Sequence, residues 1–129
     1  MSNVGKKHSV LIIDDMPMML NILGSALKAD YAVMVAKDGE KGIASAKKHK
    51  PSIILLDIVM PGMTGFEVIE ILKACEEVKD IPVIFLTGDS TDESKEKGLQ
   101  LGAVDYIEKN SAQDAIKERV ALVLQRYVI

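Results

Sequence analysis

Several polar residues in this sequence are of types that together could transfer a phosphoryl group. Asp14 and Asp15 are adjacent and directly follow four apolar residues, and Asp57 ends another apolar run. Carboxylates crowded at the edge of an apolar core repel one another and resist ionisation unless a cation lies between them. Oxygen-only ligands suit a hard cation such as Mg²⁺, which can bridge a carboxylate and a phosphate. The acids therefore predict a magnesium site.

Two further residues complete this predicted chemistry. A carboxylate such as Asp57 can attack phosphorus and form an acyl phosphate. The ammonium of Lys109 would neutralise developing charge, and the hydroxyl of Thr87 could donate to a phosphoryl oxygen. Each residue alone also fits a plainer role, because an aspartate before a helix is often its N-cap, a threonine often ends a strand, and a lysine is often a solvated charge.

The elements that must position these residues alternate between two periodicities, which is typical of an α/β fold. Apolar runs predict five strands, at 10–13, 31–36, 52–56, 81–88 and 105–108. Helical spacing predicts five helices, one from Pro17, one around 43–46, one at 66–75, one at 92–101 and one after Ser111. We expect the helix at 92–101 to be mobile because it has few large apolar residues. Ser111 and Asp114 predict a capping box for the last helix.

The order of these elements predicts where the polar residues meet. Five βα units with right-handed crossovers give a doubly wound parallel sheet, whose ligand crevice lies at the carboxyl ends of the strands. Asp14, Asp15, Asp57 and Thr87 all stand at such ends, and Lys109 follows the last strand. Five unrelated roles would give no reason for this shared edge, so the sequence favours one site.

Size, charge and cysteine usage limit the class of protein. The 129 residues suit a single domain over 1–129. The 16 basic and 19 acidic residues give a net charge too small and too mixed to indicate nucleic acid or an anionic membrane as the main partner. The basic run at 47–50 closes a predicted helix, where it complements the helix dipole. Cys75 is the only cysteine, so we expect a reduced compartment, the cytoplasm, and a packing role for Cys75. No apolar run reaches membrane-spanning length.

Four segments carry a family resemblance: "LIIDDMP", "IILLDIVMPGMTG", "VIFLTG" and "GAVDYIEKN". Together they resemble the receiver domain of bacterial two-component response regulators over nearly the whole chain. The resemblance implies a flavodoxin-like fold of strand order 2-1-3-4-5, and phosphorylation of Asp57 by a histidine kinase or phosphotransfer protein. It also implies that Asp15 and Asp57 bind Mg²⁺ with the backbone carbonyl of Val59, while Asp14 acts partly through water.

The resemblance further implies how a signal leaves the site. Thr87 would move toward the phosphoryl group, and Tyr106 would turn inward. The helix at 92–101, the strand at 105–108 and the last helix would then present a changed surface to a downstream target. Such a domain catalyses only its own phosphorylation and slow dephosphorylation. The chain ends with its last helix, so we expect it to act by binding another molecule or to be part of a longer regulator or hybrid kinase.

The sequence departs from the family at one position and leaves two others open. Family members commonly have a cis proline after the lysine, whereas this chain has Asn110, for which a cis bond costs about 2.5 to 4 kcal/mol. We expect either a trans bond or a strained loop there. Val59 and Asp89 occupy positions where the family tunes the access of hydrolytic water.

Two other functions use related features. A haloacid-dehalogenase-like phosphatase also combines a nucleophilic aspartate, a threonine, a lysine and Mg²⁺, but it normally carries Asp-x-Asp after the first strand and needs a cap domain. A flavodoxin-like FMN binder would have a Ser/Thr/Gly-rich phosphate loop in place of "DDMP", and more than the 4% aromatic residues of this chain.

Overall fold

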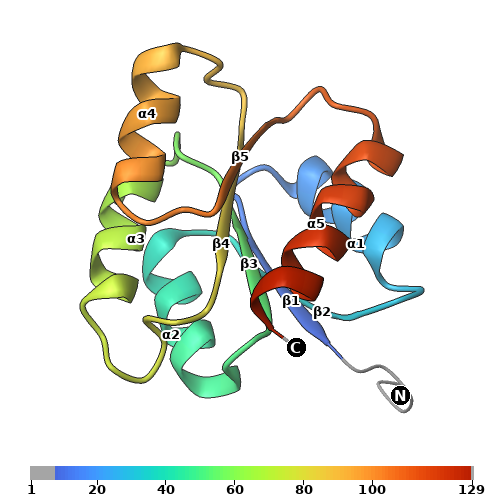
Figure 1. Ribbon diagram of the computed structural model, residues 1–129, viewed down its shortest axis with the longest axis horizontal. Helices are drawn as coiled ribbons and strands as arrows, with labels where there is room; N and C mark the ends of the chain where they lie inside the picture. Colours follow the sequence, from blue (N-terminus) through green and yellow to red (C-terminus); the bar gives the residue numbers. More distant parts are fainter. Residues whose placement is uncertain (1–7, 129) are drawn as a thin grey trace.

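The computed structural model describes residues 8–128, which form one parallel sheet with helices on both faces (Figure 1). The sheet has the order β2-β1-β3-β4-β5, and every neighbouring pair is parallel. The strands are β1 (Ser9–Ile13), β2 (Ala32–Ala36), β3 (Ile53–Leu56), β4 (Val83–Thr87) and β5 (Asp105–Glu108). The helices are α1 (Pro17–Leu27), α2 (Gly39–His49), α3 (Gly65–Lys73), α4 (Asp92–Gln100) and α5 (Gln113–Tyr127). The predicted α/β, doubly wound, flavodoxin-like fold is confirmed.

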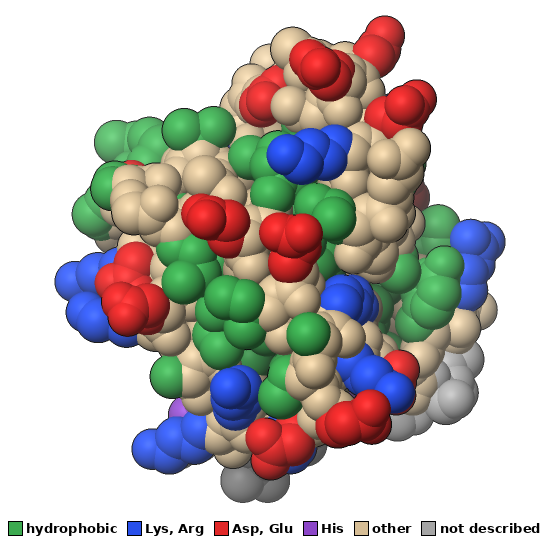
Figure 2. Space-filling model, turned by 90° about the vertical axis from the view of Figure 1, so that its left-hand side faces the viewer, with side chains coloured by type: hydrophobic (Ala, Val, Ile, Leu, Met, Phe, Trp, Pro, Cys, Tyr) green, Lys and Arg blue, Asp and Glu red, His purple; other side chains and the backbone are tan. Residues whose placement is uncertain are grey.

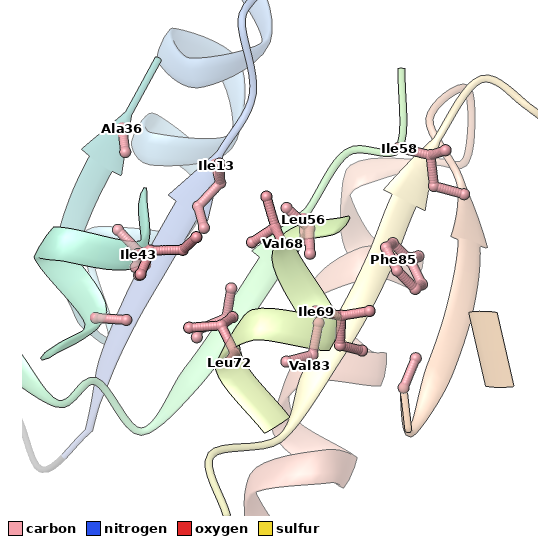
Figure 3. Close-up of a cluster of buried hydrophobic side chains, with 14 of the residues drawn as sticks. Ile13, Ala36, Ile43, Leu56, Ile58, Val68, Ile69, Leu72, Val83 and Phe85 are labelled. Carbon is pink, nitrogen blue, oxygen red and sulfur yellow. The ribbon is translucent and has the colours of Figure 1, made fainter. Parts of the chain in front are cut away.

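The two faces of the sheet each bury a separate apolar cluster. Along β1, Leu11 and Ile13 point to the face covered by α2 and α3, while Val10 and Ile12 point to the face covered by α1 and α5. Figure 3 shows the first cluster, in which side chains of α2 and α3 pack onto β1, β3 and β4. Such two-sided burial explains why β3 is apolar at every position.

Helix α4 is held less firmly than its neighbours. Gly98 is its only buried residue, and Leu99 is 43% exposed. A Cβ on Gly98 would lie 2.9 Å from the Phe85 ring, so a glycine is needed for α4 to approach the sheet this closely. The single buried position of α4 reflects the few large apolar residues in its sequence.

Two sequence predictions about helix ends are wrong. The capping box expected at Ser111 and Asp114 is absent, because α5 begins after Ala112 with no side-chain cap. A capping box is found instead before α3, between Thr64 and Glu67. Helix α3 ends at Lys73, so Cys75 lies beyond it, half-buried against the first apolar cluster rather than inside the helix.

Charges of both signs are mixed on the side of the molecule formed by α2, α3 and α4 (Figure 2). Figure 2 shows this side, where acidic, basic and apolar side chains alternate and no continuous basic area forms. The run of basic residues at 47–50 closes α2 as predicted, with Lys50 as its C-cap. Within residues 8–128, no helix is long and apolar enough to cross a membrane.

Candidate functional site

The predicted site residues meet at the carboxyl ends of the strands, which form the upper edge of the sheet in Figure 1. Sheet hydrogen bonding continues one residue past β1 and β3. The backbone N–H of Asp14 donates to the carbonyl of Ala36 at 3.1 Å, and that of Asp57 donates to the carbonyl of Ile13 at 3.0 Å. The backbone therefore fixes both aspartates beside each other before their side chains make any contact.

Three carboxylates form a compact cluster at this edge. One oxygen from each of Asp14, Asp15 and Asp57 lies within 4.8 Å of the others. Asp14 and Asp57 are buried, and Asp15 is half-buried. This brings together the three acids that the sequence assigned to a magnesium site.

The donor set fits a hard cation. Oδ1 of Asp57 is buried and has no hydrogen-bond partner among the described residues. A buried carboxylate oxygen without a partner is unfavourable, and an oxygen-preferring cation would satisfy it. Val59 is 67% exposed and lines the same hollow of about 290 Å³ as Asp15 and Asp57.

Lys109 supplies the positive charge that the cluster needs. Its Nζ lies 2.9 Å from Oδ2 of Asp14 and 2.9 Å from Oδ2 of Asp57. Burial lowers the pKa of the Lys109 ammonium, but the hydrogen bonds to these two carboxylates outweigh it and raise the pKa above its usual value. Lys109 is therefore held charged against both acids.

Asp14 illustrates the electrostatic strain of the cluster. Burial raises the pKa of its carboxyl group, while the backbone N–H of Met16 and the Lys109 ammonium lower it, and the net change is upward. Met16 donates that hydrogen bond to Oδ1 of Asp14 at 2.9 Å. Asp14 thus caps the chain entering α1 without occupying the N-cap position, which is Met16.

Thr87 ends β4 and is completely buried. Its Oγ1 accepts a hydrogen bond from the backbone N–H of Asp89 at 3.3 Å, so its own hydroxyl hydrogen can donate to an oxygen at the site. The Thr87 carbonyl accepts from the backbone N–H of Lys109 at 2.9 Å. Thr87 and Lys109 are therefore linked through the backbone of neighbouring strand ends.

The side chain of Tyr106, on β5, lies inward in this structure. It is buried beside Phe85, with ring centroids 6.2 Å apart, and its hydroxyl donates to the backbone carbonyl of Asp89. Burial, with the nearby charges of Asp89 and Asp57, raises the pKa of Tyr106 to about 12. The phenol is therefore a neutral hydrogen-bond donor at physiological pH.

Asp89 connects Tyr106 and Thr87 to α4. Its Oδ1 accepts from the backbone N–H and hydroxyl of Thr91, and its Oδ2 accepts from the hydroxyl of Ser94 at 2.6 Å. The Ser94 and Thr91 hydrogen bonds lower the pKa of the Asp89 carboxyl group. The sequence predicted only a tuning position here, and it missed this structural link.

Two further outcomes concern the loop after β5. No peptide bond in residues 8–128 is cis, so the Lys109–Asn110 bond is trans, the first of the two alternatives expected. The sequence missed a third neighbour of Lys109, since Sδ of Met16 lies 3.5 Å from its Nζ. The two residues are 93 positions apart, and only the place of Met16 next to the acid pair hinted at this contact.

This arrangement defines a class of protein: a doubly wound domain with a carboxylate, lysine and threonine site at its switch point. Comparison with known proteins identifies the family, because residues 10–121 match the model of the response regulator receiver domain. The chain belongs to that family, and it is a phosphorylation-dependent signalling switch.

Individual relatives agree with this assignment. The chain is 35% identical over 116 residues to protein PilH of Pseudomonas aeruginosa, a match covering 89% of this chain and 96% of PilH. The structure resembles the chemotaxis protein CheY4 of Vibrio cholerae, with a TM-score of 0.84, 30% identity, and coverage of 94% of this chain and 98% of that one. Nothing in these comparisons supports the haloacid-dehalogenase-like phosphatase.

Other relatives are much longer than the matched region. A Vibrio cholerae protein with the name "Probable cyclic di-GMP phosphodiesterase" is 38% identical over 117 residues, which is 91% of this chain and 26% of that protein. The chain spans about half the length of the transcriptional regulators TcrX and PhoB. Receiver domains bind Mg²⁺ at an acidic pocket and interact with histidine kinases or phosphotransfer proteins, so the family supports the coarse cofactor and partner predictions.

Proposed function

We infer that Asp57 accepts a phosphoryl group from a histidine kinase or phosphotransfer protein in a Mg²⁺-dependent reaction. The observation that carries this inference is the asymmetry of the Asp57 carboxylate. Oδ2 accepts a hydrogen bond from Lys109, whereas Oδ1 is buried and has no hydrogen-bond partner within residues 8–128. One oxygen is thereby held in place, and the other is left for an incoming electrophile or cation.

The side chains around Asp57 have distinct parts in this proposal. An oxygen of Asp57 forms a bond to phosphorus while the bond from phosphorus to the donor group breaks, so that the group is transferred intact. Lys109 and Thr87 hold phosphoryl oxygens by hydrogen bonds and stabilise their charge. Asp14, Asp15, Asp57 and the carbonyl of Val59 would hold Mg²⁺, which when bound neutralises charge on the carboxylates and on the phosphoryl group.

The output follows from the hydrogen bonds between the site and α4. Thr87 accepts from the N–H of Asp89, and Tyr106 donates to the carbonyl of the same residue. A movement of Thr87 toward a phosphoryl group would therefore disturb Asp89, whose carboxylate accepts hydrogen bonds from Thr91, the N-cap of α4, and from Ser94 in its first turn. Because α4 buries only Gly98, a small free energy suffices to shift it. The changed surface of α4, β5 and α5 would then control binding to a downstream target protein or effector domain.

The remaining sequence predictions become part of the same proposal. The domain acts on itself rather than turning over a substrate, it works in the cytoplasm, and its partners are proteins rather than nucleic acid or membrane. A steady-state assay with phosphate esters checks the first point. Release of many phosphates per protein would favour a phosphatase, whereas a receiver labels itself once and loses the label slowly.

The test of the proposed acceptor is intact-mass spectrometry after incubation with acetyl phosphate and Mg²⁺. We expect the native protein to gain one phosphoryl group, and Asp57→Asn to gain none. Asp92→Asn is the matched control, because Asp92 is an exposed acid on α4 outside the site. Equal labelling of Asp57→Asn and native protein would contradict the assignment. An unchanged extent of labelling after a chelator has removed Mg²⁺ would also contradict it.

A further inference from the structure

The thioether of Met16 occupies an unusual place beside the acceptor site. The Lys109 ammonium has three N–H donors and no acceptor. Two of them face the Oδ2 atoms of Asp14 and Asp57, each at 2.9 Å, and Sδ of Met16 lies 3.5 Å from the same Nζ. The sulfur is the weakest acceptor of the three, so its hydrogen bond is the one most easily given up to a phosphoryl oxygen.

Met16 is also open to reagents in solution. Of the methionines in residues 8–128, only Met16 and Met18 are exposed, at 47% and 69%. Met16 lines the hollow of about 290 Å³ that also contains Asp57 and Lys109. Met18 lies two residues further along, in the first turn of α1, and no hydrogen bond joins it to the site within the described residues. The two side chains are thus similar in exposure and different in location.

We propose that Met16 is an oxidation site at which peroxide switches off phosphorylation of Asp57 by converting the thioether into a competing acceptor for Lys109. The Sδ lone pair attacks one oxygen of the peroxide, an S–O bond forms and the O–O bond breaks. The sulfur loses two electrons and the peroxide gains them. The second oxygen of the peroxide takes the proton from the attacked oxygen and leaves as water. The product is methionine sulfoxide, which reductases return to methionine.

The sulfoxide changes the competition for the lysine donors. A thioether is a weak acceptor, whereas the sulfoxide oxygen is strongly polar and accepts well from an ammonium. Lys109 then has three strong acceptors before any phosphoryl group arrives, and one of these bonds must break for transfer. Breaking a hydrogen bond to a charged group lowers a rate by about tenfold or more when the bond must break before the reaction. The rate of Asp57 phosphorylation should therefore fall by about this factor after oxidation.

This inference rests on the proposed acceptor role of Asp57, and the test separates the two. Native protein, Met16→Leu and Met18→Leu are treated with hydrogen peroxide, and peptide mass spectrometry maps each added oxygen. Leucine keeps a similar volume and removes the sulfur. The rate of phosphorylation by acetyl phosphate with Mg²⁺ is then compared before and after oxidation within each variant, and again after treatment with methionine sulfoxide reductases.

We expect native protein and Met18→Leu to lose about tenfold in rate on oxidation and to regain it on reduction, while Met16→Leu keeps its own rate. A second readout needs no phosphoryl transfer: in Mg²⁺-free protein, oxidation should move the ammonium nitrogen NMR signal of Lys109 in native protein and not in Met16→Leu. Equal loss of rate in Met16→Leu, or an unmoved Lys109 signal after Met16 has gained oxygen, would overturn the inference. Failure of unoxidised protein to label would refute the acceptor role alone.

Discussion

Replacing Lys109 by methionine should show how strongly the acid cluster depends on its internal cation. The substitution removes an ammonium that lies 2.9 Å from both Asp14 and Asp57 and keeps a side chain of similar length. The carboxylates of the cluster approach within 4.8 Å of one another. Two unit charges at that separation repel by about 3 kcal/mol at an effective dielectric constant of 20. In other proteins, removing one partner of a buried ion pair lowers the free energy of unfolding by about 3 to 5 kcal/mol.

The assay is urea unfolding in a buffer that contains a chelator. We expect the free energy of unfolding of Lys109→Met to be about 3 kcal/mol below that of native protein, with an unchanged m-value. Lys79→Met is the matched control, because Lys79 pairs with Glu76 at 3.2 Å on the surface. That pair is worth about 1 kcal/mol or less.

Added Mg²⁺ provides the second half of this test. A ligand that binds only the folded state stabilises it by about 2.7 kcal/mol at a hundred times its dissociation constant. The gain should be larger for Lys109→Met than for native protein, since the ammonium no longer offsets the negative charge that attracts the ion. A loss in Lys109→Met no greater than that in Lys79→Met would refute this account of the cluster, and so would an absence of stabilisation by Mg²⁺ in both proteins.

Three further outcomes follow from individual contacts. The pKa of Tyr106 is raised from 10.0 to about 12, so between these pH values the folded state keeps a proton that the unfolded chain releases. The free energy of unfolding should therefore fall as the pH rises through this interval. In Tyr106→Phe the urea midpoint, measured against pH, should no longer show this fall. A Cβ on Gly65 would lie 2.2 Å from the backbone oxygen of Asp57, so Gly65→Ala should lower stability by about 1 to 3 kcal/mol and slow labelling by acetyl phosphate, and an unchanged labelling rate would argue against this steric role. Thr64→Ala removes the capping box with Glu67 and should cost about 1 kcal/mol in urea unfolding without changing labelling.

The location of the site could be predicted from the sequence because it depends on the ends of apolar runs. Residues 10–13 of β1 and the whole of β3 are buried on both faces, so these stretches are apolar and end abruptly at Asp14 and Asp57. Parallel strands end at one edge of a sheet, and this brings distant acids together without knowledge of any side-chain contact. The same argument placed Thr87 and Lys109 correctly.

The contacts that the sequence did not reveal are those between side chains from different loops. Sδ of Met16 reaches Lys109 across the gap between the β1–α1 and β5–α5 loops, and a methionine near a crevice is most often packing. The Asp89 carboxylate accepts hydrogen bonds from the Thr91 and Ser94 hydroxyls at the start of α4, and both of these residues are weakly patterned polar residues. The start of α5 was misassigned because Ser111 has a capping composition, while the structure begins the helix after Ala112.

The most direct test of the account is to identify the residue that carries the phosphoryl group. An acyl phosphate on an aspartate is reduced by borohydride to homoserine, which peptide mass spectrometry can locate in protein labelled by acetyl phosphate and Mg²⁺. We predict homoserine at residue 57, with Asp14 and Asp15 unchanged. Homoserine at residue 14 or 15, or labelled protein with residue 57 still aspartate, would contradict the assignment of Asp57 as the acceptor.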